Sequence, residues 1–459
     1  MIETTGTIET TDPTTGRALE RFELMDAGQI DAKLDAAADC AALWSRASFE
    51  ERARVLRAVA VRLRAESDSL AAGAVREMGK PIVQARAEVE KCASALDYFA
   101  EHGAAMLAAQ PAPSSAKRSY VAFRPLGVLL AIMPWNFPYW QVIRAAAPAL
   151  MAGNTMVLKH AANTTRCALE LERIFGETGA PQGLFGALIA RGDGIDKLLA
   201  DPRIAAVTLT GSERAGVAVA RAAGDALKKC VLELGGSDPF VVFSDADLDA
   251  AARTAVRARF QNNGESCIAA KRFLVENGVY DEFLTRFAEL AGAQVVGDPM
   301  EERVQLGPCA RQDLRQTVHE QVVATLRRGA HLALGGKPLE REGYFYEPTV
   351  VADVVPGMRM FEEEVFGPAA AVVRADSREH ALALANASPF GLGSSLWTRD
   401  VAAAEDFAAR VEAGAVFING MVASDPRLPF GGVKRSGYGR ELSAFGIHEF
   451  VNIQTVWIG

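Results

Sequence analysis

Cys267 is the residue of this sequence best suited to covalent chemistry, because it stands on a short polar turn (261–266) ahead of a predicted strand, 273–275. Gly264 and Ser266 add little bulk, so a thiol on this turn can approach a ligand closely. As a thiolate it would be a nucleophile. The alternative is a buried structural cysteine, and the turn alone does not separate the two.

Asn136 and Glu233 are the next candidates. Asn136 lies between two prolines in the segment Pro-Trp-Asn-Phe-Pro, which follows the apolar run 128–133. A rigidly held amide can stabilise a developing oxyanion, although an ordinary turn-forming Asn would look the same. Glu233 interrupts an apolar segment before two glycines. Burial would raise its pKa and suit it to general-base work, unless a nearby lysine such as Lys228 or Lys229 neutralises it.

Three further polar groups follow predicted strands or turns. Lys159 ends the apolar run 155–158, where a cation can reach a ribose or a phosphate. Ser212 opens a predicted helix, whose free amides can bind a phosphate. Glu364 belongs to an acidic run that could hold a ribose. Taken singly, each also fits an ordinary exposed residue or turn.

The elements that must position these residues alternate regularly. Helical sequence runs from 26 to 106, with a break at 79–81. Short apolar strands then alternate with helices over 128–234, which predicts a doubly wound parallel sheet with ligands at its carboxyl ends. A second α/β block follows from 239 to 419. The tail, 451–458, alternates like an exposed strand that pairs with another subunit or within its own chain.

Composition excludes several classes of protein. The 459 residues are 49% hydrophobic and 23% charged, with a net charge of -8, which argues against nucleic-acid binding. No apolar stretch approaches the length of a membrane span, and the polar segment 1–5 predicts no signal peptide. The six cysteines are scattered, so we expect free thiols, no metal site and a cytoplasmic protein without membrane partners.

The motifs together resemble the aldehyde dehydrogenase superfamily over essentially the whole chain. The resemblance rests on five segments in the family's order: 134–138, 232–236, the Cys267 turn, Glu-Val-Phe-Gly-Pro (364–368) and Phe-Gly-Gly-Val-Lys-Arg-Ser-Gly-Tyr-Gly-Arg-Glu (430–441). The amino-acid sequences of 133–142, 158–161, 235–240 and 448–457 are similar to those of the shorter bacterial NAD(P)-dependent succinate-semialdehyde dehydrogenases.

The resemblance implies an α/β fold with three parts. A Rossmann-type NAD(P)-binding domain would comprise 1–106 and 126–235, and a second α/β catalytic domain would comprise 236–442. Residues 107–125 and 443–459 would form a small β extension that joins subunits into a homodimer or homotetramer.

The resemblance also implies roles. Cys267 would be the nucleophile, Asn136 and the Cys267 N–H would hold the oxyanion, and Glu233 would activate water. NAD or NADP would contact Met133, Pro134, Trp135, Lys159, Ala162, Gly211, Ser212, Leu234, Glu364 and Phe366. The choice of cofactor stays open, because Ala162 stands where many NAD-preferring relatives carry an acid that repels a 2′-phosphate.

The proposed substrate is a short aldehyde with a distal carboxylate. Trp140 and Arg144 share one helix face, so Arg144 could pair with that carboxylate while Ser424 donates a second bond. The alternative is that Arg144 pairs with an internal acid. The family often has Gln at the position of Glu265, and a carboxylate there could raise the pKa of the thiol.

The leading hypothesis is therefore the oxidation of an aldehyde to a carboxylic acid with NAD(P), with succinate semialdehyde giving succinate. A broader aliphatic or aromatic specificity is the first alternative. The presence of Glu233 disfavours transfer to coenzyme A, and no His stands in a motif that would activate Cys267 as in a thiol protease. A catalytically silent protein on the same fold would not need Cys267, Glu233 and Asn136 together.

Overall fold

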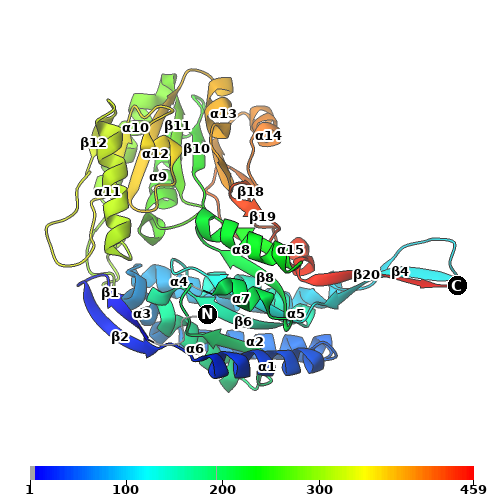
Figure 1. The fold of residues 1–459 in the computed structure, drawn as a ribbon. Coiled ribbons are helices and arrows are strands. Elements are labelled where there is room, and N and C mark those ends of the chain that lie inside the picture. The colour runs from blue at the N-terminus through cyan, green and yellow to red at the C-terminus, as the bar shows by residue number, and fades with distance from the viewer. Residues whose placement is uncertain (1–5, 193) are drawn as a thin grey trace.

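The computed structural model describes residues 6–192 and 194–459. Two α/β bodies lie one above the other, and a thin ribbon of strands projects to one side (Figure 1). The segment 1–5, on which the absence of a signal peptide was predicted, lies outside the described residues. Among the described residues, no helix is long and apolar enough to cross a membrane.

The first body begins with a β-hairpin and four helices. The hairpin pairs β1 (Thr7–Asp12) with β2 (Arg17–Glu23), and the helices are α1 (Ala27–Trp44), α2 (Phe49–Ala65), α3 (Ser67–Met78) and α4 (Ile82–Met106). Asp26 and Gln29 form a capping box at α1. Gly79 ends α3 in the left-handed region, at φ 81°, and Pro81 precedes α4. The predicted break at 79–81 is therefore confirmed.

The six-stranded sheet of the first body confirms the doubly wound prediction. Its order is β19-β9-β8-β5-β6-β7, and all neighbours from β9 to β7 are parallel. The strands are β5 (Val128–Met133), β6 (Thr155–His160), β7 (Phe185–Leu188), β8 (Ile204–Thr210), β9 (Lys229–Glu233) and β19 (Gly437–Tyr438); the helices between them are α5 (Trp140–Ala152), η1 (Ala162–Thr164), α6 (Thr165–Glu177), α7 (Ile195–Ala200) and α8 (Glu213–Asp225).

The second body is built on a seven-stranded sheet of order β12-β13-β14-β11-β10-β16-β17. Its strands are β10 (Asp238–Val242), β11 (Ala270–Glu276), β12 (His331–Leu334), β13 (Thr349–Ala352), β14 (Ala369–Ala375), β16 (Gly393–Trp397) and β17 (Ala415–Ile418). The helices of this body are α9 (Leu248–Phe260), η2 (Gln261–Gly264), η3 (Asn277–Val279), α10 (Tyr280–Gly292), α11 (Gln312–Leu326), α12 (Arg359–Glu362), α13 (Arg378–Asn386) and α14 (Val401–Arg410). A short pair, β15 (Phe390–Gly391) with β18 (Val433–Lys434), lies beside it.

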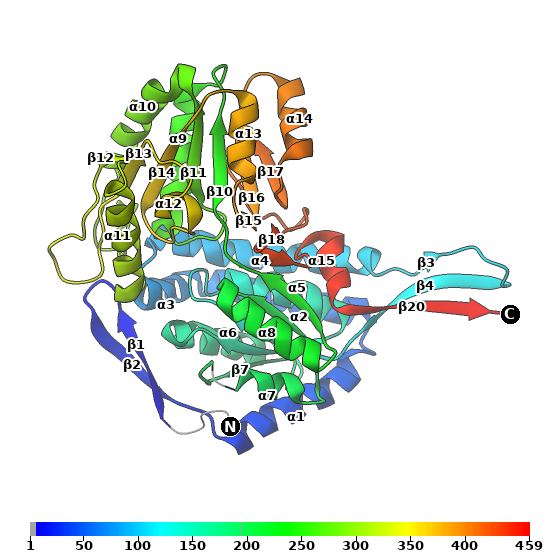
Figure 2. The same ribbon diagram turned by 45° about the horizontal axis from the view of Figure 1, so that its top comes forward.

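The projecting ribbon contains β3 (Gln110–Pro111), β4 (Arg118–Pro125) and β20 (Val451–Ile458). β20 pairs antiparallel with β4 over its whole length, so the tail strand pairs within its own chain, as one of the two predicted alternatives had it. The ribbon extends well beyond the two bodies in both views (Figures 1 and 2). Ile453 and Trp457 are 60% and 57% exposed on it.

Residues 437–450 pack against the first body. β19 pairs with β9 of the first sheet, and α15 (Ser443–Glu449) packs on α4 and α5. Leu442 and Ile447 are buried in the same core as α4 and α5, which explains the packing. Our proposed boundaries divide this segment between the catalytic domain (236–442) and the extension (443–459), and its contacts lie with the first body.

Candidate active site

The loop that carries Cys267 is held in a left-handed backbone conformation. Asn262, Asn263 and Gly264 have φ of 54°, 59° and 73°. A Cβ on Gly264 would lie 2.5 Å from the carbonyl oxygen of Gly367, so only glycine fits there. Strain of this kind persists only where the surroundings fix it, and it is common at functional sites.

The backbone of Cys267 is oriented by a buried lysine. Lys271 Nζ donates to the carbonyl oxygens of Ser266 (2.8 Å) and Cys267 (2.7 Å) and lies 3.5 Å from Glu364 Oε1. Within the described ranges, no acceptor meets the Cys267 N–H. That N–H is therefore available to an oxyanion on the attacked carbon.

The Cys267 thiol is half-buried. Burial raises its pKa to about 11, and the Arg144 and Lys271 cations oppose that rise, while Glu364 and Glu233 add to it. Glu265 is not among the groups with the largest effects on the pKa of the thiol. Its buried carboxylate accepts from the Ala310 N–H at 3.0 and 3.3 Å, and burial holds its own pKa well above the usual range.

Asn136 is tied to the same loop. Its Nδ2 donates to the Glu265 carbonyl oxygen at 3.0 Å, and Asn262 Nδ2 donates to the Asn136 carbonyl oxygen at 2.9 Å. A carboxamide has two N–H donors, so this bond fixes the Asn136 side chain and leaves one donor. The structure thus brings Asn136 and the Cys267 loop together.

Glu233 lies at the end of β9, opposite Thr210 of β8, and is 2% exposed. In the described part of the chain, neither of its carboxylate oxygens has a hydrogen-bond partner. Burial and the neighbouring Glu441 raise its pKa well above the usual range, against the pull of Arg144 and Arg440. Pairing with Lys228 or Lys229 is not observed: Lys228 donates to the Asp201 carbonyl, and Lys229 pairs with Glu449.

Arg144 has an internal acidic partner, which was the second of our two interpretations. Its guanidinium forms an ion pair with Glu441, and both side chains are 2% exposed. It also donates to Thr210 Oγ1 at 3.2 Å and lies 4.5 Å from the centre of the Phe430 ring. A substrate carboxylate could take over this cation only by disrupting a buried pair, which is costly.

The residues assigned to the cofactor gather at the carboxyl ends of the first sheet. Met133 lies opposite His160 across β5 and β6, and the Trp135 and Phe366 rings meet edge to face at 5.7 Å. Glu364 accepts from the Gly236 N–H at 3.0 Å. A ligand at the ends of these strands would therefore meet residues from both bodies.

The neighbouring helix starts fit a bound phosphate. Ser212 is exposed and caps α8, and a Cβ on Gly211 would meet only Leu209, at 3.7 Å. The free amides of such a helix start attract anions. Ala162 is exposed in η1, just beyond Lys159 on β6, and Leu234 is buried against Gly216 of α8. The arrangement of these residues fits a dinucleotide cofactor. Because position 162 is an alanine, no carboxylate stands there.

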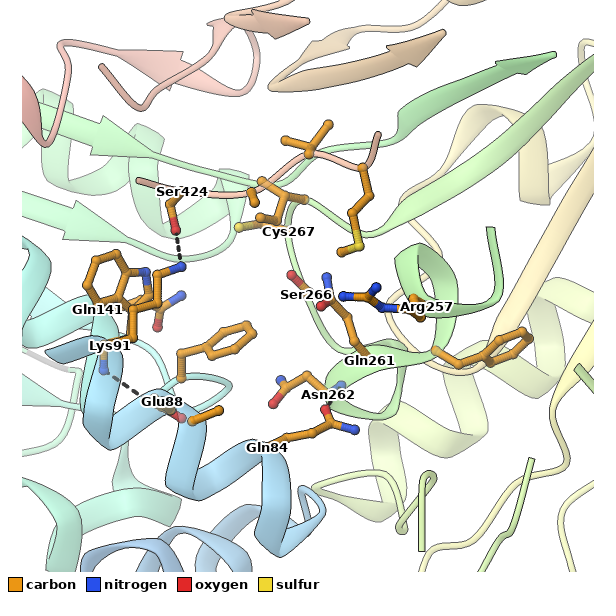
Figure 3. Close-up of a pocket in the computed structure, with 18 of the residues that line it drawn as sticks. Gln84, Glu88, Lys91, Gln141, Arg257, Gln261, Asn262, Ser266, Cys267 and Ser424 are labelled. Atoms are coloured by element: carbon orange, nitrogen blue, oxygen red, sulfur yellow. Dashed lines mark hydrogen bonds between the residues drawn. The ribbon is translucent and has the colours of Figure 1, made fainter. Parts of the chain in front are cut away.

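A cavity of about 460 Å³ leads to the thiol by another route, since none of the proposed cofactor residues lines it. Its wall contains all three predicted substrate residues, Trp140, Arg144 and Ser424, together with Cys267. It also contains Lys91 of α4, which the sequence pattern does not single out, because a lysine on a helix is usually a solvated surface residue. Figure 3 shows Cys267 and Ser424 turned into this cavity, with a hydrogen bond joining Ser424 to Lys91.

A strained loop that presents a half-buried thiol between two α/β bodies, with an unpaired carboxylate nearby, defines the class as two-domain enzymes with a cysteine nucleophile. The family model of the aldehyde dehydrogenases matches residues 1–456. The chain belongs to the aldehyde dehydrogenase family.

Several relatives are similar over nearly the full chain. The Escherichia coli succinate semialdehyde dehydrogenase [NAD(P)+] Sad is 52% identical over 446 residues, which are 97% of this chain and 96% of that protein. Succinate-semialdehyde dehydrogenase [NADP(+)] 1 of Mycobacterium tuberculosis is 50% identical, covering 98% and 99%. The solved succinic semialdehyde dehydrogenase from Streptococcus pyogenes, in complex with NADP+, superposes with a TM-score of 0.96 at 36% identity, covering 98% and 99%.

Proposed function

We propose that this enzyme oxidises succinate semialdehyde to succinate with NAD+ or NADP+. The observation that carries the proposal is the cavity itself, which places a cation, Lys91, in the same wall as the nucleophile, Cys267. The relatives at about half identity over the whole chain support the same substrate and both cofactors.

In the proposed mechanism, the Cys267 thiolate attacks the aldehyde carbon. The Cys267 N–H and the second amide hydrogen of Asn136 donate to the oxygen that gains charge. Trp135, Ser212 and Glu364 would hold NAD(P)+ at the strand ends, where it would accept the hydride that the thiohemiacetal carbon loses as the thioester forms. Glu233 then takes a proton from water, which attacks the thioester and releases the acid. Of the Arg144–Glu441 pair, Glu441 raises the pKa of Glu233 and Arg144 lowers it.

The test is the rate of NADH and NADPH formation with succinate semialdehyde and with 4-methylpentanal, an uncharged aldehyde of the same shape. We expect strong preference for the semialdehyde and no activity in Cys267→Ala. Equal rates would leave an aldehyde dehydrogenase of broader specificity. Absence of reduced cofactor with every aldehyde would instead support a silent protein on this fold.

We further propose that the enzyme is a cytoplasmic homodimer or homotetramer joined through the projecting ribbon. Exposed apolar side chains on β20, such as Ile453 and Trp457, support association. All six cysteines are free, as is usual in a reducing compartment.

A further inference from the structure

We propose that Lys91 Nζ and Ser424 Oγ together bind the distal carboxylate of the substrate. This inference rests on the proposed function and names the residues that give it its specificity. It replaces Arg144 as the cation of the carboxylate site and keeps Ser424 as the second donor.

The geometry places the two donors in one wall of the cavity. Lys91 Nζ lies 2.7 Å from Ser424 Oγ and 4.4 Å from the centre of the Trp140 ring. Lys91 comes from α4, Trp140 from the start of α5 and Ser424 from the loop ahead of Phe430. All three line the same cavity as Cys267 (Figure 3). The thiol and the ammonium therefore open onto one cavity, and in the proposed complex the substrate lies between them.

The ammonium of Lys91 lacks an anion. Across the described residues, no carboxylate lies within ion-pair distance of it, although it is half-buried. The acids nearby are already engaged. Glu88, almost one helical turn earlier, pairs with Lys80 and accepts from the N–H groups of Tyr139 and Trp140. Asp425 pairs with Arg427.

A partly buried cation without an anionic partner is unfavourable, and here burial lowers the pKa of Lys91 to about 8. A bound carboxylate would supply the missing charge. An ammonium has three N–H donors, and Ser424 uses one of them, so two remain for the carboxylate oxygens. The Trp140 ring beside the ammonium offers an apolar surface to the methylene groups of the substrate.

Other cations of the cavity do not meet these conditions. Arg144 is already paired with Glu441 in the interior. Arg257 on α9 lines the cavity but is solvent-exposed, so water screens its charge. Arg257 therefore offers a matched control, because its replacement removes one positive charge from the same cavity.

The experiment compares kcat/KM for succinate semialdehyde and 4-methylpentanal in Lys91→Met, Lys91→Arg and Arg257→Gln. In Lys91→Met we expect the semialdehyde value to fall about 30-fold or more, mainly through KM, since a charge-assisted bond is lost. The value for 4-methylpentanal should stay within about threefold, which shows that the variant is folded and active. Lys91→Arg should recover part of the loss, and Arg257→Gln should change little.

A fall shared equally by both aldehydes in Lys91→Met would overturn the inference, as would an unchanged preference for the semialdehyde. If Lys91→Met does not fold, Ser424→Ala gives the second test, with an expected rise in KM of about three- to tenfold for the semialdehyde alone. Failure of the proposed function would look different, because the unmodified enzyme itself would then show no preference.

Discussion

At the scale of single residues, the nucleophile, the proposed general base and a nearby arginine are close enough for their charges to interact. Arg144 lowers the pKa of both the Cys267 thiol and the Glu233 carboxyl, and Glu233 raises the pKa of the thiol. The sequence predicted Cys267 and Asn136 through their motifs, and the structure joins Asn136 to the Cys267 loop through the carbonyl oxygen of Glu265. The sequence alone did not show whether Arg144 pairs with a substrate carboxylate or with an internal acid, because that acid, Glu441, is distant in sequence.

The pKa of Lys91 leads to a prediction about pH. Burial lowers it from 10.5 to about 8, with Arg144 adding to the effect and Cys92, Glu88 and Asp425 opposing it. The ammonium is present below pH 8 and is lost as the pH rises through that value. We therefore expect the ratio of kcat/KM for succinate semialdehyde to that for 4-methylpentanal to fall above about pH 8.

The ratio cancels the titration of Cys267, because both aldehydes need the same thiolate. It is measured across alkaline pH for the enzyme and for Lys91→Arg. In that variant the ratio should stay level, since Arg does not lose its proton in this range. A ratio that is flat in the unmodified enzyme would contradict the prediction.

At the scale of elements, the regular alternation of apolar strands and helices was enough to predict the first sheet. Short-range patterns did not predict β19, because a two-residue strand has no periodicity of its own and is formed by its pairing with β9. Lys91 was missed for a related reason: which face of α4 is covered depends on α5 and on the loop around Ser424.

The start of α5 depends on a buried ion pair. Lys80 and Glu88 are 0% and 2% exposed, and Glu88 also accepts from the N–H groups of Tyr139 and Trp140. Lys80→Met leaves Glu88 without its cation, so we expect a loss of about 3–5 kcal/mol in the free energy of unfolding. This loss should appear as a lower midpoint of thermal unfolding, which is the quantity to measure.

The control for this prediction is Arg86→Met, which removes a cation from exposed pairs with Asp68 and Glu302. Its midpoint should remain close to that of the unmodified protein. If both variants lost the same stability, the buried pair would have no special role in holding α5.

The short helix η1 leads to a prediction on cofactor choice. Ala162→Asp places an acid just beyond Lys159, where it would repel the 2′-phosphate of NADP+. We expect kcat/KM with NADP+ to fall about tenfold relative to that with NAD+. Ala402→Asp on exposed α14 adds the same charge far from the site and should leave the ratio unchanged.

At the scale of the whole molecule, the projecting ribbon of β3, β4 and β20 is largely exposed in the single chain. A three-stranded sheet without a covering layer is only marginally stable alone. β20 exposes residues on both of its faces, and Ile453 and Trp457 lie on the same face. We expect the double variant Ile453→Lys, Trp457→Lys to sediment as a smaller species than the unmodified protein.

Sedimentation velocity compares this variant with Leu43→Lys, which replaces an apolar side chain that is 73% exposed on α1. That control should sediment like the unmodified protein. An unchanged coefficient in the double variant would show that β20 does not join subunits.

The left-handed loop before the nucleophile has a consequence for chemical ageing. An Asn-Gly pair in a mobile chain tends to lose ammonia through attack of the following backbone nitrogen on the side-chain amide. In Asn263-Gly264 that amide is fixed: Nδ2 donates to the carbonyls of Gly79 and Pro308, and Oδ1 accepts from the Gly307 N–H. Deamidation at Asn263 should therefore follow the rate at which the loop opens, so storage life becomes a measure of local unfolding.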